Sequence, residues 1–272
     1  MIAMLAIILG VVVVIFLVAV FVVPSVVRAG IGVTENAAGG WRERVLFRYQ
    51  NLSQTPELSV FRATFAWVFA WFKLRLDTMF GELPEFLGSI PRIESVLDIG
   101  CGFGVAGCAL LEWRPEMHLF GIDPRPDRVH AAKAAFGERG EAVIGRAPDI
   151  NIAGFPTHFD TALMLDMIHF LTDEQLAVTL KNIGGKLSAG GLLVIRAIIP
   201  PAGGGSWAWK FAAARRTLLR EYACHRPVEA VANMLAAAGF DVGKTQISGG
   251  NPELMWIIST AGRSEAAESK PE

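Results

Sequence analysis

A buried strand that leads directly into a glycine-rich loop is the feature that most constrains the fold of this chain. Residues 96–104 read Val-Leu-Asp-Ile-Gly-Cys-Gly-Phe-Gly, and a helical pattern over residues 105–113 follows. The glycines allow the backbone to turn tightly and let a ligand approach where a Cβ would intrude. This order of elements predicts a ligand site at the carboxyl end of a sheet.

Short apolar runs alternate with amphipathic helical stretches from residue 95 onward, which is typical of a parallel sheet with helices on both faces. We expect an α/β, Rossmann-like fold with a mostly parallel seven-stranded sheet within residues 91–262, followed by a disordered tail at 263–272. The expected strands are residues 96–99, 119–122, 142–145, 161–165, 192–196, 240–247 and 254–260. A helix at residues 228–239 should end at Gly239.

Two carboxylates indicate the ligand. Asp123 ends the second expected strand, nineteen residues after Gly104, where it can accept hydrogen bonds from both ribose hydroxyls of a nucleoside. Residues 102–107 also satisfy the GxGxxG pattern of nicotinamide-binding proteins, so the loop alone does not decide between cofactors. Asp98, ahead of the glycines, suits a ligand with a cationic end and disfavours a pyrophosphate.

The loop resembles the first motif of class I S-adenosylmethionine-dependent methyltransferases of the small-molecule and lipid type. The resemblance covers roughly residues 96–260, including the runs 159–171 and 187–195. It implies S-adenosylmethionine as cofactor. The residues implied to bind it are Asp98, Gly100, Cys101, Gly102, Gly104, Asp123, Pro124, Ala147, Asp149 and Leu165. One departure concerns adenine: the family commonly places an acidic residue directly after the third strand, whereas here Arg146 follows Gly145 and Asp149 comes later.

Methyl transfer depends mainly on holding the nucleophile, carbon and sulfur in line and on excluding water. A hydroxyl acceptor would benefit from a base, and we name His169 and Asp166, at the end of the fourth expected strand, as catalytic candidates. The alternative is structural: Asp166 would cap the next turn, and His169 would pack with Phe170.

The N-terminal residues 1–27 contain no charged side chain, and such a run is long enough to cross the hydrocarbon layer as one transmembrane helix. A cleaved signal peptide is the alternative, but those peptides begin with basic residues and this chain does not. Arg28, Arg42, Arg44 and Arg48 follow the run, so the positive-inside bias predicts a single-pass protein of the cell membrane with a cytosolic catalytic domain.

Residues 28–90 are expected to form a linker, at 29–40, and an amphipathic juxtamembrane region. Helical spacing of apolar residues over 58–80 predicts an interfacial helix, a cover on the catalytic domain or an ordinary core helix. A second aromatic and cationic segment, residues 207–222, follows the flexible loop 200–205 and is placed to cover the acceptor site.

Composition limits the partners. A net charge of −1 gives no basic face for nucleic acid, and three cysteines without a CxxC pair suggest neither a disulfide framework nor a metal site. The runs 165–171 and 73–80 are faintly similar to methyltransferases encoded with bacterial lipid and aryl-polyene synthesis systems, which implies an acyl or aryl chain acceptor. We expect a small lipophilic acceptor, acyl, aryl or quinone-like, free or carrier-bound, at the cytosolic membrane face. The alternatives are an NAD(P)-dependent oxidoreductase and a non-catalytic membrane scaffold that retains the fold.

Overall fold

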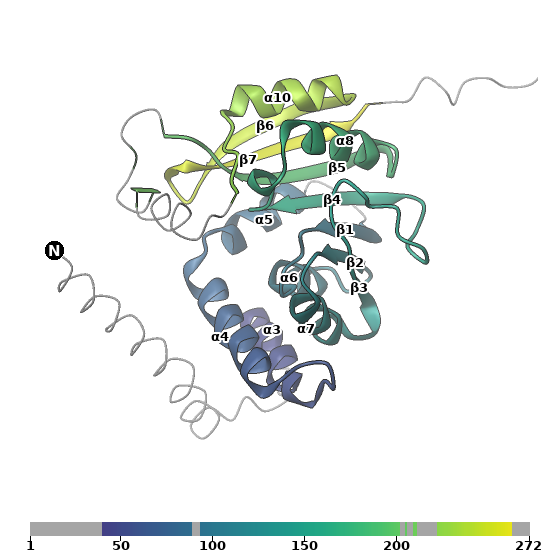
Figure 1. Cartoon of the computed structure of the whole chain (residues 1–272), viewed down its shortest axis with the longest axis vertical. Helices are drawn as coiled ribbons and strands as arrows, with labels where there is room; N and C mark the ends of the chain where they lie inside the picture. Colours follow the sequence, from purple (N-terminus) through teal and green to yellow (C-terminus); the bar gives the residue numbers. More distant parts are fainter. Residues whose placement is uncertain (1–39, 89–92, 202–204, 206–208, 211–221, 263–272) are drawn as a thin grey trace, which may run out of the picture.

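The computed structural model describes residues 40–88, 93–201, 205, 209–210 and 222–262, and these form one seven-stranded sheet with helices on both faces (Figure 1). The strand order is β3-β2-β1-β4-β5-β7-β6. The strands are β1 (Ser95–Ile99), β2 (His118–Asp123), β3 (Gly140–Ile144), β4 (Phe159–Leu165), β5 (Leu187–Ile198), β6 (Phe240–Ser248) and β7 (Asn251–Ala261). The helices are α3 (Trp41–Gln50), α4 (Val60–Leu76), α5 (Met79–Gly88), α6 (Val105–Trp113), α7 (Pro126–Phe136), α8 (Asp173–Gly184) and α10 (Val228–Ala237).

The sheet is mixed, so the expectation of a mostly parallel sheet was wrong. β1 to β5 pair in parallel, but β7 lies antiparallel to both β5 and β6. The pairing of β7 with β6 follows from the two-residue turn between them, where Gly249 and Gly250 both have positive φ. So short a connection can form only a hairpin, whereas parallel neighbours need a crossover of a dozen or more residues.

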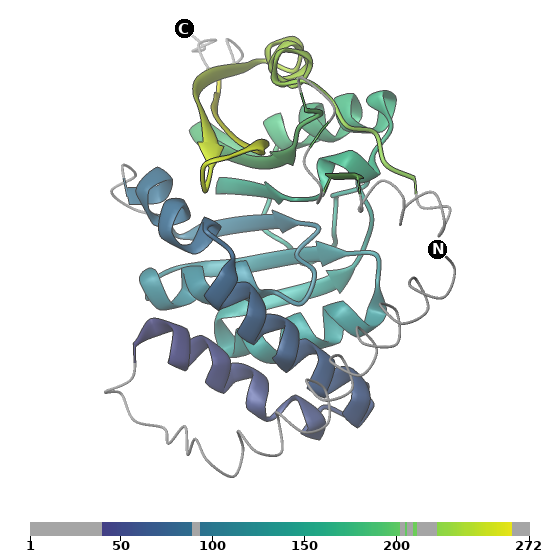
Figure 2. The same cartoon turned by 90° about the vertical axis from the view of Figure 1, so that its left-hand side faces the viewer.

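Two hydrophobic clusters lie on opposite faces of the sheet. Alternation along β1 sends Val96 into the cluster with α3 to α7, and Leu97 and Ile99 into the cluster with α8 and α10. The helices α3, α4 and α5 therefore belong to the same core as α6 and α7. Figure 2 shows α3 and α4 side by side, and both contact α6 and α7.

The helical region expected over residues 58–80 is two helices. α4 ends at Leu76 and α5 begins at Met79, because the Asp77 carboxylate accepts a hydrogen bond from the Met79 amide at 2.9 Å and caps the second helix. α4 buries its small residues Ala63, Ala66 and Ala70 against the domain. It is thus a cover on the domain, and several of its large aromatic residues remain exposed.

The expected transmembrane segment, residues 1–27, the linker 29–39, the tail 263–272 and most of the segment 207–222 lie outside the described residues. Among the residues that the structure does describe, no helix is both long and apolar enough to cross a bilayer.

Candidate functional site

The glycine loop connects β1 to α6 with three glycines in the left-handed region. Gly100, Gly102 and Gly104 have φ of +77°, +57° and +80°. The amides of Gly100 and Cys101 both donate to the carbonyl oxygen of Ile122, at 2.7 and 3.0 Å, which ties the loop to the end of β2. A Cβ at Gly104 would lie 2.5 Å from the Phe136 ring, whereas a Cβ at Gly102 would meet nothing within 4 Å. Gly104 therefore serves packing, and Gly102 leaves open space for a ligand.

Two buried carboxylates lie beside this loop. Asp98 is 2% exposed and Asp123 is 3% exposed. The Asp123 carboxylate accepts hydrogen bonds from the amides of Gly102, at 3.1 Å, and Arg125, at 2.9 Å, so it is fixed where the loop and β2 meet. Burial, together with the charge of Asp123, raises the pKa of Asp98 to about 7. A cation placed here would stabilise the ionised form of Asp98.

The other residues implied to bind the cofactor are spread around the same sheet edge. Pro124 is exposed directly after β2, and Leu165 is half-buried at the end of β4. Ala147 is buried in the loop after β3, next to a cis peptide bond with Pro148. Asp149 is exposed in that loop, and its carboxylate accepts from the Asn151 amide at 3.4 Å. The structure thus brings Asp98, the glycines and Asp123 together but gives Asp149 only a local turn contact.

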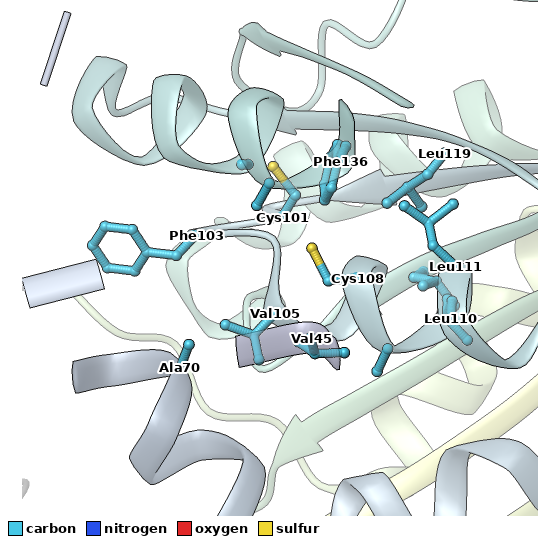
Figure 3. Packing of buried hydrophobic residues seen from close by; sticks show 14 of the residues in the cluster. Val45, Ala70, Cys101, Phe103, Val105, Cys108, Leu110, Leu111, Leu119 and Phe136 are labelled. Carbon is cyan, nitrogen blue, oxygen red and sulfur yellow. The ribbon is translucent and has the colours of Figure 1, made fainter. Parts of the chain in front are cut away.

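Aromatic residues from α3 and α4 cover the outer side of the glycine loop. The Tyr49 hydroxyl donates to the Phe103 carbonyl at 2.7 Å, and burial raises the pKa of Tyr49 well above its usual value, so the phenol remains a donor. Figure 3 shows the Phe103 ring projecting away from the packed side chains of Cys101 and Phe136. The rings of Phe65 and Phe69 lie 5.8 and 5.2 Å from it, centroid to centroid.

Asp166 sits directly after β4 with a positive φ of 56° and is held by ion pairs. Its Oδ2 lies 3.1 Å from Lys73 Nζ and 3.2 Å from Arg196 Nη1. Arg196, 3% exposed, also binds Asp77, at 2.9 Å. These four residues form an ion network that joins α4, β4 and β5. Both cations engage Oδ2, which supports a positioning role for Asp166, whereas the buried Oδ1 has no hydrogen-bond partner among the described residues, so a role for Asp166 as base stays a prediction.

His169 lies in the short helix η4 (Ile168–Phe170) at the same edge of the sheet and is 7% exposed. Its ring packs on Phe170, with centroids 4.1 Å apart, and stacks with His225 at 5.4 Å. Arg226 fixes this helix by donating to the carbonyls of Ile168, at 3.1 Å, and Leu171, at 2.7 Å. The packing expected as the structural alternative is present, and a role for His169 as base stays a prediction.

Comparison with known proteins identifies the core of this site. Residues 97–193, from β1 into β5, match the sequence profile described as "Methyltransferase domain". This region is a methyltransferase domain. A search of curated proteins gave no sequence match.

Solved structures share the fold of this chain over most of its length. The pyocyanin biosynthetic protein PhzM is 20% identical with a TM-score of 0.56, and the match covers 91% of this chain and 69% of PhzM. An O-methyltransferase family protein from Burkholderia thailandensis is 18% identical with a TM-score of 0.60, and the match covers 80% of this chain and 64% of that protein. Human N-acetylserotonin methyltransferase, solved in complex with S-adenosylmethionine, is 16% identical with a TM-score of 0.57. The match covers 79% of this chain and 59% of the human protein. The chain thus spans less than two thirds of the length of the last two proteins.

The residues of the methyltransferase domain fit S-adenosylmethionine, in agreement with the cofactor expected from the sequence. Asp98 offers a buried carboxylate to the cationic methionine end, and Asp123 lies at the end of the second strand, where its carboxylate can accept hydrogen bonds from the ribose hydroxyls. Gly102 leaves space that a side chain would fill. A nicotinamide cofactor fits less well, because its pyrophosphate would meet the carboxylate of Asp98 at the glycine loop.

Sequence reasoning missed the residues that support the methyltransferase domain from outside it. The sequence did not indicate that the site is contacted by Tyr49, Asp77, Lys73 and Arg196. The only local signal was the i, i+4 spacing of Lys73 and Asp77, whose Nζ and Oδ2 lie 2.6 Å apart. The other contacts join residues far apart in sequence, so no sequence pattern announces them.

Proposed function

We propose that this protein transfers a methyl group from S-adenosylmethionine to an oxygen of a small-molecule acceptor. The observation that carries the proposal is the pair of buried carboxylates, Asp98 and Asp123, beside a glycine loop with open space at Gly102. The choice of oxygen is supported by structural neighbours, since the Burkholderia protein and the mitomycin 7-O-methyltransferase MmcR are named as O-methyltransferases.

The chain's contribution to such a reaction is mainly positional. The donor supplies a sulfonium-bound methyl group, which is already electrophilic. Asp98 would hold the methionine end, Asp123 the ribose, and Leu165 would border the donor at the end of β4. Asp166 would set the backbone that follows β4, because Lys73 and Arg196 hold its carboxylate. His169 is the residue we assign to accept a hydroxyl proton from the acceptor.

We extend the proposal to a membrane-anchored enzyme with a lipophilic acceptor, acyl, aryl or quinone-like. Its support is the absence of charge over residues 1–27 and the cations that follow this run. Retention of the full chain in a membrane pellet after alkaline washing, with release by detergent, would support the anchor. Release of the full-length chain by the alkaline wash would contradict it.

The test of the cofactor is calorimetric titration of the full chain in detergent with S-adenosylhomocysteine and, separately, with NADH. We expect tight binding of the first ligand only. Asp123→Asn should weaken that binding about tenfold or more, because one ionic acceptor is lost while the side-chain shape is kept. Folded protein that binds NADH instead would overturn the proposal.

A further inference from the structure

One helix carries an unusual share of the exposed apolar surface. Phe61, Phe69 and Phe72 are 48%, 38% and 43% exposed, and Leu76 is 73% exposed. Together with the half-buried Phe65 they recur at intervals of three or four residues along α4. Residues at this spacing lie on one side of a helix, so they form a single stripe, which we call the α4 stripe.

The α4 stripe lies opposite the surface by which α4 is attached. Ala63, Ala66, Ala70 and Leu74, at most 3% exposed, pack into the core shared with α3 and α6. The helix is therefore attached to the domain by the face that carries its small side chains, and the face that carries its large aromatic side chains points outward. Aromatic residues on the attached side would have buried more apolar area, so the outward stripe needs another reason.

Cations flank the α4 stripe on both sides. Arg62, 47% exposed, pairs with Asp127 at 2.6 Å, and the exposed Arg75 lies over the Trp71 ring at 4.9 Å. An apolar stripe bordered by arginines is the composition of a helix that lies in the plane of a bilayer interface, where the arginines meet anionic head groups. A contact with a second copy would not need cations at the margins.

The chain itself supplies a way to hold this stripe at a membrane. The uncharged run 1–27 precedes α3, and the thirteen residues 28–40 span at most about 45 Å when fully extended. A stripe tethered within that distance of a bilayer needs little affinity of its own, since its effective concentration there is high.

We propose that the α4 stripe lies in the interfacial layer of the bilayer and brings the glycine loop to the membrane surface. This inference rests on the membrane anchoring proposed above and adds the face by which the domain meets the lipid. The inner edge of the stripe contacts the loop, because the rings of Phe65 and Phe69 pack on Phe103. A lipophilic acceptor would then pass from the lipid to the donor site along α4 without crossing water.

The test uses the full chain in vesicles of equal parts phosphatidylcholine and phosphatidylglycerol. A Cys224→Ser background removes the one native cysteine among the described residues that is not buried. An environment-sensitive fluorophore is attached at Phe72→Cys and, as matched control, at Val178→Cys, which is 47% exposed on α8 of the opposite layer. We expect blue-shifted emission at position 72, quenched by nitroxide-labelled lipid, and unshifted, unquenched emission at position 178.

A second variant tests whether the quenching depends on insertion of the α4 stripe into the lipid. Adding Phe61→Glu and Leu76→Glu to the labelled position-72 protein should abolish the quenching, because the two charges oppose insertion while both side chains are exposed. Blue-shifted emission without lipid quenching would mean that protein covers the stripe, and equal emission at positions 72 and 178 would mean that nothing covers it. Either result overturns the inference. Binding of S-adenosylhomocysteine in the same samples reports separately on the proposed function.

Discussion

At the scale of single residues, the site depends on two buried carboxylates, Asp98 and Asp123, and on three glycines. Asp98 is a carboxylate deprived of water, and Gly100, Gly102 and Gly104 occupy backbone conformations that L residues avoid. Such features persist when they serve a ligand or a close approach. Substitutions can show which of these residues serves the ligand and which serves packing.

The first prediction concerns pH. The pKa of Asp98 is raised to about 7 in the folded protein, against about 4 for an unfolded chain, so stability contributed by the protonated acid is complete below pH 4 and lost as pH rises through 7. We expect the free energy of unfolding of the ligand-free protein to fall by up to about 4 kcal/mol over this range. The loss should be smaller in Asp98→Asn. Urea unfolding at several pH values measures it, and parallel pH profiles for the two proteins would contradict it.

The second prediction compares two alanines in one loop. Gly104→Ala places a Cβ 2.5 Å from the Phe136 ring at a positive φ, so we expect a loss of about 2–4 kcal/mol in the free energy of unfolding. Gly102→Ala meets no atom within 4 Å and should cost only about 1–2 kcal/mol. It should nevertheless weaken S-adenosylhomocysteine binding more than tenfold, because the methyl group occupies ligand space. Calorimetry and thermal unfolding of both variants decide the matter; normal cofactor binding by Gly102→Ala would contradict it.

At the scale of elements, the ion network of Lys73, Asp77, Asp166 and Arg196 joins the C-terminal end of α4 to the ends of β4 and β5. Burial alone would raise the pKa of Asp77, but Lys73 and Arg196 together lower it below its usual value. The two carboxylates and two cations balance in charge. The network therefore positions α4, and with it the aromatic cover over Phe103, relative to the donor site.

The third prediction is that removing the buried cation loosens this connection. Arg196→Met leaves Asp77 and Asp166 with only Lys73 between them, so we expect a loss of about 3–5 kcal/mol in the free energy of unfolding. Lys73→Met should cost less, about 1 kcal/mol, because Lys73 is 26% exposed and solvent screens its charge. The deficit of Arg196→Met should shrink as acid protonates Asp77. Denaturant unfolding of both variants at neutral and acidic pH tests the ranking, and equal losses would refute it.

At the scale of the whole molecule, the helices before the glycine loop are part of the folded unit. The buried side chains of Tyr49, Leu74 and Phe80 share one cluster with α6, α7 and the sheet. The matched profile begins only at residue 97, so the methyltransferase domain of this chain is completed by elements outside that profile.

The fourth prediction follows for truncations. A chain that begins at residue 40 should keep its thermal unfolding temperature and its affinity for S-adenosylhomocysteine, because it retains the whole of that cluster. A chain that begins at residue 93 should fail to fold cooperatively, because it lacks α3 to α5 and the apolar faces of α6 and α7 that those helices cover become exposed to water. Circular dichroism melting of the two truncated chains tests this. A cooperative transition in the shorter one would show that α3 to α5 are dispensable.

The sequence alone determined the features that depend on neighbouring residues. The strand that leads into Gly100, Gly102 and Gly104, the helix over 105–113 and the carboxylate at the end of β2 all lie where local pattern placed them, because turn chemistry and periodicity act over a few residues. The positions of the glycine loop and of Asp123 were predictable for that reason. Tertiary structure alone decided that β7 pairs antiparallel with β5, that Asp166 is held by Lys73 and Arg196, and that α4 attaches by its alanines. Those features arise from contacts between residues distant in sequence, whose energies depend on packing and burial that no local pattern encodes.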